Sequence, residues 1–499
     1  MPASIRRALD ELPTSLDNTY ARALQEIPKE TWGYAHCLFQ CLVAAVRPLR
    51  VEELAEIFAI QFDSDGKMTF KMEESLRPEN AEDAVLSACS TLIAIISDED
   101  SQIVQFSHFS VKEFLTSNRL STTNDANISR YYIGLEAAHT ILAKACLAEL
   151  LQLDDKVDKT RLGTFPLAIY AAEHWVDHAK FERVASLIGD GMERLFDPTK
   201  SHFATWISIF DVDRPWLRPL EDLEEPPPRP SATPLYYAAL CGFRCLAEHL
   251  IVVHAQDVNA HDGYRRFPLI VAVRERHLGV ARLLYDYGAD VDASDGYHST
   301  SLHLAAQIGD LEAMQFLLDR GANVNARDIY EESPSWEALQ NGKLEAMRLL
   351  LEHGADANSQ SVSCWSILHR ASWKGNLEAV RLLLQHHADV DARDDGSQTP
   401  LHEASLNGHA NVVQLLIECG ADVDAQNQCH DTPLLYASRK GELEVVRLLL
   451  GHGADVHVRS AEYRSPLQEA SANGHHEIVQ LLLEHDPNVE QEDSSIPSD

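Results

Sequence analysis

The chain has 499 residues, of which 45% are hydrophobic and 24% are charged, which is typical of a globular protein. Its formal net charge of −35 argues against nucleic-acid phosphate as the main partner, because phosphate binding needs a cationic surface. Nine scattered cysteines without a C-x-x-C pair indicate a reducing compartment rather than a disulfide framework. No signal-peptide core and no apolar run long enough for a membrane helix is found, so we expect neither secretion nor a membrane span.

Residues 1–128 predict three helices followed by a β-hairpin, an order typical of a winged helix. The helices are expected at 30–47, 51–60 and 80–90, and the strands at 91–97 and 102–107. In DNA-binding relatives of this fold the third helix enters the major groove. Here that helix carries Glu79, Glu82 and Asp83 but no Lys or Arg. We therefore expect a structural role and no nucleic-acid binding.

Residues 129–220 predict a helical region, and residues 221–231 a proline-rich, acidic linker ("EDLEEPPPRPS") with an extended backbone. His174 and His178 lie four apart in "EHWVDH", as zinc-binding histidines do, but Trp175 stands where a zinc protease has Glu. We expect packed or exposed histidines and no metal. The pairs Cys37/Cys41 and Cys241/Cys245 lack a second pair of ligands, so buried small residues are expected there.

From residue 232 to 490 one pattern recurs with a period of about 33 residues, and only its first step is one residue longer. Its marker positions are Leu235, Leu269, Leu302, Ser335, Leu368, Leu401, Leu434 and Leu467. Two residues before the marker, seven of the eight copies have Ser or Thr, which predicts a helix N-cap. Proline follows that residue in six copies, and glycine stands seven after the marker in every copy but the second, where Arg276 stands.

Each copy therefore predicts a short helix, a turn, a second amphipathic helix such as "NVVQLLIEC" (411–419) and a projecting loop. No copy can bury its apolar face alone, so the copies should stack as a solenoid. With "TPLH" at 399–402 and a recurring "GADV", the chain resembles the ankyrin-repeat family over these residues. The resemblance implies a mostly helical fold with about eight ankyrin repeats that bind protein partners. Residues 491–499 are expected to be an acidic disordered tail.

The segments "VRPLRVEELAEIFAI", "FSHFSVKEFLTS" and "YAAEHWVDHA" resemble the part that follows the nucleotide-binding domain in fungal NACHT–ankyrin proteins, which are STAND-type sensor NTPases. The phosphate loop of that family is missing: Gly66-Lys67 is followed by Met68 and Gly342-Lys343 by Leu344, without the required Ser or Thr. The chain is thus expected to be the C-terminal half of such a protein, by truncation, gene splitting or a misassigned start, and to bind no nucleotide.

Large aromatic and basic residues at the loop tips and on the short helices form the expected protein-binding surface, since Tyr, Trp and Arg are enriched in binding hot spots. Three tyrosines recur at the repeat period and should form a column. The predicted surface comprises Tyr264, Arg266, Arg274, Tyr297, Tyr330, Trp365, Trp373, Lys374, Arg393, Arg439, Lys440, Tyr463 and Arg464. The alternative is that the tryptophans pack between repeats and the tyrosines only cover loop backbone. The nearby cations suggest an acidic or phosphorylated partner segment.

We find no nucleophile motif and no cofactor signature, so no catalytic, cofactor-binding or metal-binding residues are predicted and the chain is not expected to be an enzyme. The expected function is a protein-binding scaffold in the cytoplasm, or alternatively the nucleus, and the resemblance implies a role in signalling or self/non-self sensing. The alternative function is a substrate adaptor for a ubiquitin ligase or another enzyme complex. Ser335 stands where seven copies have Leu, which predicts a weak joint in the solenoid.

Overall fold

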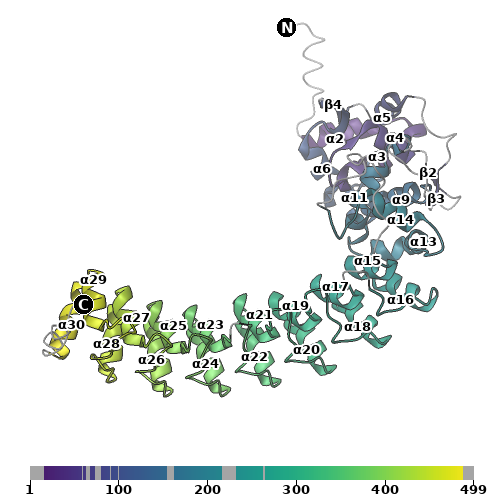
Figure 1. The fold of residues 1–499 in the computed structure, drawn as a ribbon. Coiled ribbons are helices and arrows are strands. Elements are labelled where there is room, and N and C mark those ends of the chain that lie inside the picture. The colour runs from purple at the N-terminus through teal and green to yellow at the C-terminus, as the bar shows by residue number, and fades with distance from the viewer. Residues whose placement is uncertain are drawn as a thin grey trace, which may run out of the picture. The chain divides into compact units, whose positions relative to one another are not determined.

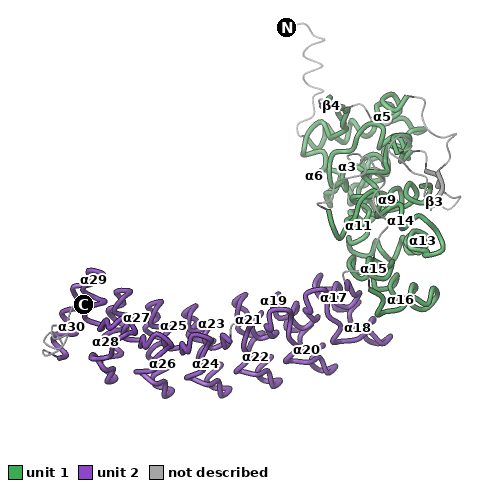
Figure 2. Tube along the Cα trace, in the orientation of Figure 1, with its two compact units in different colours: residues 1–263 green, residues 264–499 purple. Residues whose placement is uncertain are grey.

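The computed structural model describes residues 16–58, 60–62, 68–72, 80–89, 91–98, 101–153, 162–215, 232–261, 265–362 and 364–486. The chain divides into two compact units, residues 1–263 and 264–499 (Figure 2). The predicted linker (221–231) and tail (491–499) lie outside the described residues. In the described ranges, none of the helices is both long and apolar enough to cross a membrane.

Unit 1 begins with the predicted winged helix (Figure 1). Its helices are α2 (Leu16–Gln25), a 3-10 turn (Lys29–Thr31), α3 (Trp32–Ala44), α4 (Val51–Phe58), α5 (Ala81–Cys89), α6 (Phe109–Leu115), α7 (Asn118–Ser121) and α8 (Ala126–Ser129). The hairpin of β4 (Ile93–Asp98) and β5 (Ser101–Phe106) is antiparallel, and the short β1 (Leu49–Arg50) pairs with β5, which gives the strand order β1-β5-β4. The sequence did not predict the second hairpin, β2 (Ile60–Phe62) with β3 (Met68–Met72).

The helical region of unit 1 packs against the first repeat through a shared aromatic core. Its helices are α9 (Leu135–Leu150), α11 (Ala168–Ala179), α12 (Val184–Leu187), α13 (Gly189–Leu195) and α14 (His202–Ile209), and the repeat consists of α15 (Pro234–Cys241) and α16 (Arg244–Val252). The fully buried rings of Trp175 and Trp206 lie 5.2 Å apart, centroid to centroid. The ring of Phe243 in the repeat lies 5.6 Å from Trp175, and the ring of Tyr237 lies 6.3 Å from Trp206. The first repeat is therefore part of this unit.

Unit 2 holds seven further helix pairs, with the first helices in one row and the second helices in the other (Figure 1). The pairs are α17 (Pro268–Arg274) and α18 (Leu278–Asp286), α19 (Ser301–Ile308) and α20 (Leu311–Asp319), α21 (Pro334–Gln340) and α22 (Leu344–Glu352), α23 (Ile367–Trp373) and α24 (Leu377–Gln385), α25 (Pro400–Leu406) and α26 (Ala410–Glu418), α27 (Pro433–Lys440) and α28 (Leu443–Gly451), and α29 (Pro466–Ala472) and α30 (His476–His485).

The predicted caps begin and end the first helices. The hydroxyls of Thr233, Ser333 and Ser465, for example, accept a hydrogen bond from the third backbone amide that follows them. The glycines seven after the marker all have positive φ, between +67° and +85°. Arg276, which replaces glycine in the second repeat, adopts φ +62°, a conformation that costs free energy for a residue with a Cβ.

The loops between repeats are joined by a ladder of side-chain-to-backbone hydrogen bonds. Asn325 Oδ1 accepts from the amide of Asp356 at 2.8 Å, and Asn358 Oδ1 accepts from the amide of Asp389 at 2.7 Å. Equivalent bonds to the next loop are made by the carboxylates of Asp292, Asp391 and Asp424. Because each acceptor lies in one repeat and its donor in the next, the ladder fixes neighbouring repeats in register.

At the joint between the fourth and fifth repeats, the backbones of the two first helices approach each other over only a short stretch. The first helices of these two repeats, α21 and α23, approach each other along a shorter stretch of backbone than other neighbouring first helices of unit 2 do. Ser335 is buried, with 1% of its surface exposed, and its Oγ has no hydrogen-bond partner in the described part of the chain. The indole of the adjacent Trp336 is also buried. Ser335, from which a weak joint was predicted, thus lies where neighbouring first helices approach least closely along their backbones, and the weak joint stays a prediction.

We expect Ser335→Ala to raise the free energy of unfolding by about 1–2 kcal/mol, because a buried hydroxyl without a partner costs that much in desolvation. Ser335→Leu should raise the unfolding midpoint further, since burying a leucine side chain contributes about 1.5–3 kcal/mol. Urea titrations followed by circular dichroism measure both. Stabilisation by alanine combined with destabilisation by leucine would show that Trp336 already occupies the room of the missing side chain.

Candidate functional site

In the loop tips of unit 2, an Asp or Asn side chain recurs that accepts hydrogen bonds from backbone amides of its own turn. Asp328 Oδ1 accepts hydrogen bonds from the amides of Tyr330 (2.8 Å) and Glu332 (2.9 Å), and Asp295 Oδ1 does the same for Tyr297 and Ser299. Backbone bonds then join successive tips: the amide of Ile329 donates to Tyr297 O, and the amide of Val362 donates to Tyr330 O. These bonds fix the tips beside one another, as the repeat period predicts.

Two of the three tyrosines of the predicted column are prominently exposed. Tyr297 is 65% exposed and Tyr330 is 56% exposed, so both side chains are accessible to a partner. Tyr264 lies outside the described residues. Tyr463 is 72% exposed, but it stands one position later in its loop, at positive φ, and so outside the register of the column.

The two predicted tryptophans lie together in the fifth repeat. Their ring centroids are 6.4 Å apart. Trp365 is half-buried and its Nε1 donates to Asp394 Oδ2 of the next repeat at 3.2 Å, so it has the packing role that the sequence left as the alternative. Trp373, 40% exposed, stays available on the surface and carries the Arg370 guanidinium over its ring at 4.9 Å.

Most of the predicted cations make hydrogen bonds or ion pairs within the chain. Lys374 Nζ donates to Gln340 O at 2.7 Å, Arg393 donates to Ser397 O and Gln426 O, and Arg439 pairs with Asp431 and Glu469. Arg274 pairs with its neighbour Glu275, Arg464 approaches Glu462 at 4.0 Å, and Arg266 is half-buried. Lys440 is exposed.

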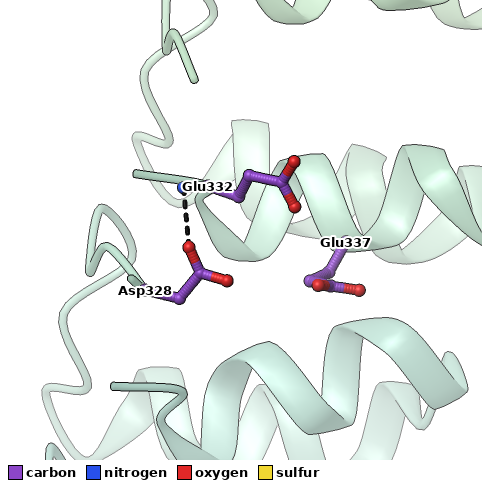
Figure 3. A group of neighbouring side chains, drawn as sticks. All are labelled: Asp328, Glu332 and Glu337. Atoms are coloured by element: carbon purple, nitrogen blue, oxygen red, sulfur yellow. Dashed lines mark hydrogen bonds between the residues drawn. The ribbon is translucent and has the colours of Figure 1, made fainter. Parts of the chain in front are cut away.

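Acidic side chains gather directly behind the tip of Tyr330. The carboxyl oxygens of Asp328, Glu332 and Glu337 lie within 4.8 Å of one another (Figure 3). Burial, with the neighbouring carboxylates, raises the pKa of Glu332 to about 7, and burial and Asp328 raise the pKa of Glu337. Over the described part of the chain, no Lys or Arg forms an ion pair with any of the three. Such oxygens suit a divalent cation, although acidic groups of this kind commonly hold none.

Three histidines after the repeat marker, His303, His369 and His402, are buried and connect adjacent repeats. The Nδ1 of His402 accepts from the amide of Thr399 at 3.1 Å, and its Nε2 donates to Asp431 O at 3.0 Å. Burial lowers the pKa of all three, to about 4 for His402. These imidazoles are therefore neutral structural links. Trp336 takes the equivalent position in the fourth repeat, which lacks this link to the fifth.

His402→Gln should flatten the pH dependence of stability between pH 6.5 and 4. The folded pKa of His402 lies below its unfolded value, so its contribution is present above pH 6.5 and is lost as the pH falls toward 4. For a shift of this size the loss reaches about 3 kcal/mol. Gln468 already makes the same capping interaction in the last repeat, which shows that glutamine fits.

The measurement is the free energy of unfolding at pH 7.5, 6 and 5 for wild type, His402→Gln and the exposed control His452→Gln. Carboxyls with raised pKa, such as Glu332 and Glu403, act in the opposite direction in this window, and the comparison between variants cancels them. An unchanged slope in His402→Gln, equal to that of the control, would contradict a neutral buried His402.

The alternatives weighed in unit 1 are structural. His178 Nδ1 lies 2.9 Å from His139 Nδ1, and its Nε2 lies 2.9 Å from Tyr170 Oη, so neither ring nitrogen is open for a metal. Cys37, Cys41 and Cys241 are buried as expected, but Cys245 is exposed, so that prediction was wrong for one residue. Glu82 and Asp83 are exposed on α5. A pocket of ≈ 190 Å³ lies between α3 and β5, lined among others by Val46 and Phe106.

Sequence reasoning missed two apolar tip residues, Ile329 (42% exposed) and Val362 (65% exposed). Ile329 directly precedes the column position of Tyr330, and Val362 lies one repeat further along, so the period could have identified them. It also missed the acidic cluster, because Asp328 and Glu337 come together only when the loop folds back onto α21. Glu403, buried to 4% exposure and with its pKa raised to about 7 by burial and Asp394, was missed for the same reason.

Family models agree with both parts of this architecture. A model of ankyrin repeats (3 copies) matches residues 302–394, 335–427 and 401–493, and a second ankyrin-repeat model (many copies) matches 269–318. The model described as GPI inositol-deacylase, winged helix domain, matches residues 26–128. The chain therefore contains ankyrin repeats and, toward its N-terminus, a winged-helix domain.

Among known proteins, the chain is similar to "Azaphilone pigments biosynthesis cluster protein L" of Monascus ruber, with 32% identity over 296 residues. The match covers 56% of this chain and 61% of that protein, so the chain spans less than two thirds of this relative. It is also similar to the crystal structure of the human ASB11 ankyrin repeat domain, with 31% identity and a TM-score of 0.40. That match covers 44% of this chain and 98% of the solved chain.

Proposed function

We propose that the chain is a protein-binding scaffold without enzymatic activity, and that the repeats of unit 2 hold the partner. The observation that carries the proposal is the row of exposed apolar side chains on successive tips, Tyr297, Ile329, Tyr330 and Val362, which we call the tip stripe. Apolar groups gathered on a surface in this way mark interaction sites. Large aromatic side chains suit binding because they bury much area while few torsions are frozen.

A signalling or self/non-self sensing role, in the cytoplasm or nucleus, is the setting we infer for this scaffold. It is supported by the resemblance of the N-terminal segments to those of NACHT–ankyrin proteins. The matched winged helix is compatible with a part that relays domain position. The acidic helix α5, with exposed Glu82 and Asp83, supports a role without nucleic acid.

The second candidate, an adaptor that delivers a bound client to an enzyme complex such as a ubiquitin ligase, needs a second contact surface. The pocket beside Val46, which is itself 52% exposed, supports such a surface in unit 1. Under this candidate the repeats still bind a client, and the winged helix binds a constant subunit. The two candidates therefore differ in what contacts unit 1.

Site-specific photo-crosslinking in extracts of the native cells tests the proposal. A photoreactive amino acid replaces Tyr297, Val46 or, as a control on an outer helix, Glu378 in the full chain. The scaffold predicts a partner crosslinked from Tyr297 and absent from the Glu378 control. A constant ligase subunit crosslinked from Val46 favours the adaptor, and no specific product from Tyr297 refutes binding at the tips.

A further inference from the structure

The chemistry of the partner can be inferred from what lies around the tip stripe. The amide of Ile329 is bonded to Tyr297 O at 3.0 Å, and the amide of Val362 to Tyr330 O at 3.2 Å. The stripe is thus a fixed run of apolar side chains across three neighbouring tips rather than a set of separate loops. An extended peptide segment laid across the tips meets one apolar group after another.

Negative charge adjoins this stripe on the side of the short helices. Asp328 accepts a hydrogen bond from the amide of Tyr330 and so fixes that turn. Its carboxylate also lies close to those of Glu332 and Glu337 (Figure 3). Glu332 and Glu337 are half-buried, and burial disfavours their ionised forms. A cation brought by a partner stabilises these carboxylates, because the charge of Arg370 offsets burial and the repulsion between the carboxylates only in part.

The nearest basic group compensates that charge only in part: Arg370 lowers the pKa of Glu332, but burial and the neighbouring carboxylates outweigh it. Arg370 donates to Gln340 Oε1 at 2.9 Å and lies over Trp373, and Arg327 donates to the backbone oxygens of Glu331 and Gln360. Of the cations first expected to attract an acidic partner, Arg439 is paired with Asp431 and Glu469. Behind Tyr330 the surrounding groups together raise the pKa of Glu332 to about 7, so negative charge predominates there. Charge complementarity at the stripe therefore favours a basic partner over an acidic or phosphorylated one.

We propose that the tip stripe and the carboxyls of Glu332 and Glu337 form one docking surface for an extended segment of a partner protein that carries an arginine or lysine beside apolar residues. The apolar residues pack on Tyr297, Tyr330 and Val362, and the basic head binds the carboxyls. This inference rests on the proposed function, since it assumes that the repeats bind a protein at their tips.

The test uses random 12-residue peptides displayed on phage, selected on the full chain at physiological salt. Selected peptides are synthesised and their affinity is measured by fluorescence anisotropy. The chain variants are Glu332→Gln/Glu337→Gln and Tyr297→Ser/Tyr330→Ser. The matched control is Glu352→Gln/Glu378→Gln, which removes the same charge from exposed positions of outer helices and so corrects for general attraction to an acidic protein.

We expect enriched peptides with Arg or Lys next to apolar residues. Their affinity should fall about tenfold or more on Glu332→Gln/Glu337→Gln and less than twofold on the control. Peptides that need the tyrosines but tolerate Glu332→Gln/Glu337→Gln overturn the basic partner and leave the proposed function standing, as does enrichment of acidic peptides. Peptides that are all indifferent to the tyrosines refute both. Stoichiometric Ca²⁺ binding that is lost in Glu332→Gln/Glu337→Gln and blocks the peptides assigns the carboxyls to a metal instead.

Discussion

Replacing Tyr297 and Tyr330 together with alanine is expected to reduce partner affinity by about a thousandfold while leaving the fold intact. Each side chain is more than half exposed, and truncation of a true hot spot costs about 2 kcal/mol or more in binding. Two such losses add to about 4 kcal/mol if each tyrosine contacts its own part of the partner, which corresponds to about a thousandfold in affinity. An exposed side chain contributes little to folding, so the stability should change by no more than about 0.5 kcal/mol for each.

The binding measurement is the affinity for a partner or selected peptide, paired with the melting temperature of the same preparation. Tyr463→Ala is the matched control, since it removes an equally exposed tyrosine that stands outside the column. If the double variant melts several degrees lower and binds normally once folded, the tyrosines are packing residues and the stripe is not the site.

Trp175→Ala should produce the largest loss of stability, about 3–5 kcal/mol, because it empties the centre of an aromatic core. Trp175 is fully buried, with the rings of Trp206, Phe196 and Phe243 within 6.2 Å of its centroid. Since Phe243 belongs to the first repeat, the substitution should loosen that repeat together with the helical region. Hydrogen exchange of α15 and α16 should then increase along with that of α11 and α14.

Denaturant titrations of Trp175→Ala and Trp373→Ala give the comparison. Trp373 is the same residue type at 40% exposure, so its loss should cost much less. Increased exchange confined to α11, with α15 and α16 unchanged, would show that the first repeat folds independently of this core.

The sequence predicted the repeat architecture because its signals are local. A hydroxyl before Pro, a buried leucine and a glycine at positive φ recur among the repeats, and each of these features depends on one short stretch of backbone. Their recurrence at a fixed period then predicts the stacked solenoid. The winged helix was predicted on the same basis. The hairpin of β2 and β3 was missed because Ile60 continues the apolar pattern of α4, although the helix ends at Phe58. The end of a helix in a short apolar run depends on tertiary pairing that periodicity does not report.

At the candidate site, the sequence located Tyr297 and Tyr330 but not the electrostatics around them. Arg393 and Lys374 donate hydrogen bonds to backbone oxygens of neighbouring repeats. These bonds could not be predicted, because a backbone carbonyl has no signature in the sequence. The carboxyls of Asp328, in the loop, and Glu337, in α21, come close only because the loop folds back onto that helix. The carboxyl cluster is thus a property of one folded repeat, whereas the bonds of Arg393 and Lys374 depend on the stacking of neighbouring repeats.

The Asp and Asn ladder between the loops has an evolutionary consequence. Asn325 Oδ1 binds the amide of Asp356 in the next loop, and Asn358 Oδ1 binds the amide of Asp389 in the loop after that. The loops at residues 323–325, 356–358, 389–391 and 422–424 each present both a backbone donor and an Asp or Asn acceptor, whereas His457 stands at the acceptor position of the following loop. An in-frame duplication or deletion of one such repeat therefore leaves no acceptor or donor unmatched. The number of repeats can change while the same hydrogen bonds join the new neighbours.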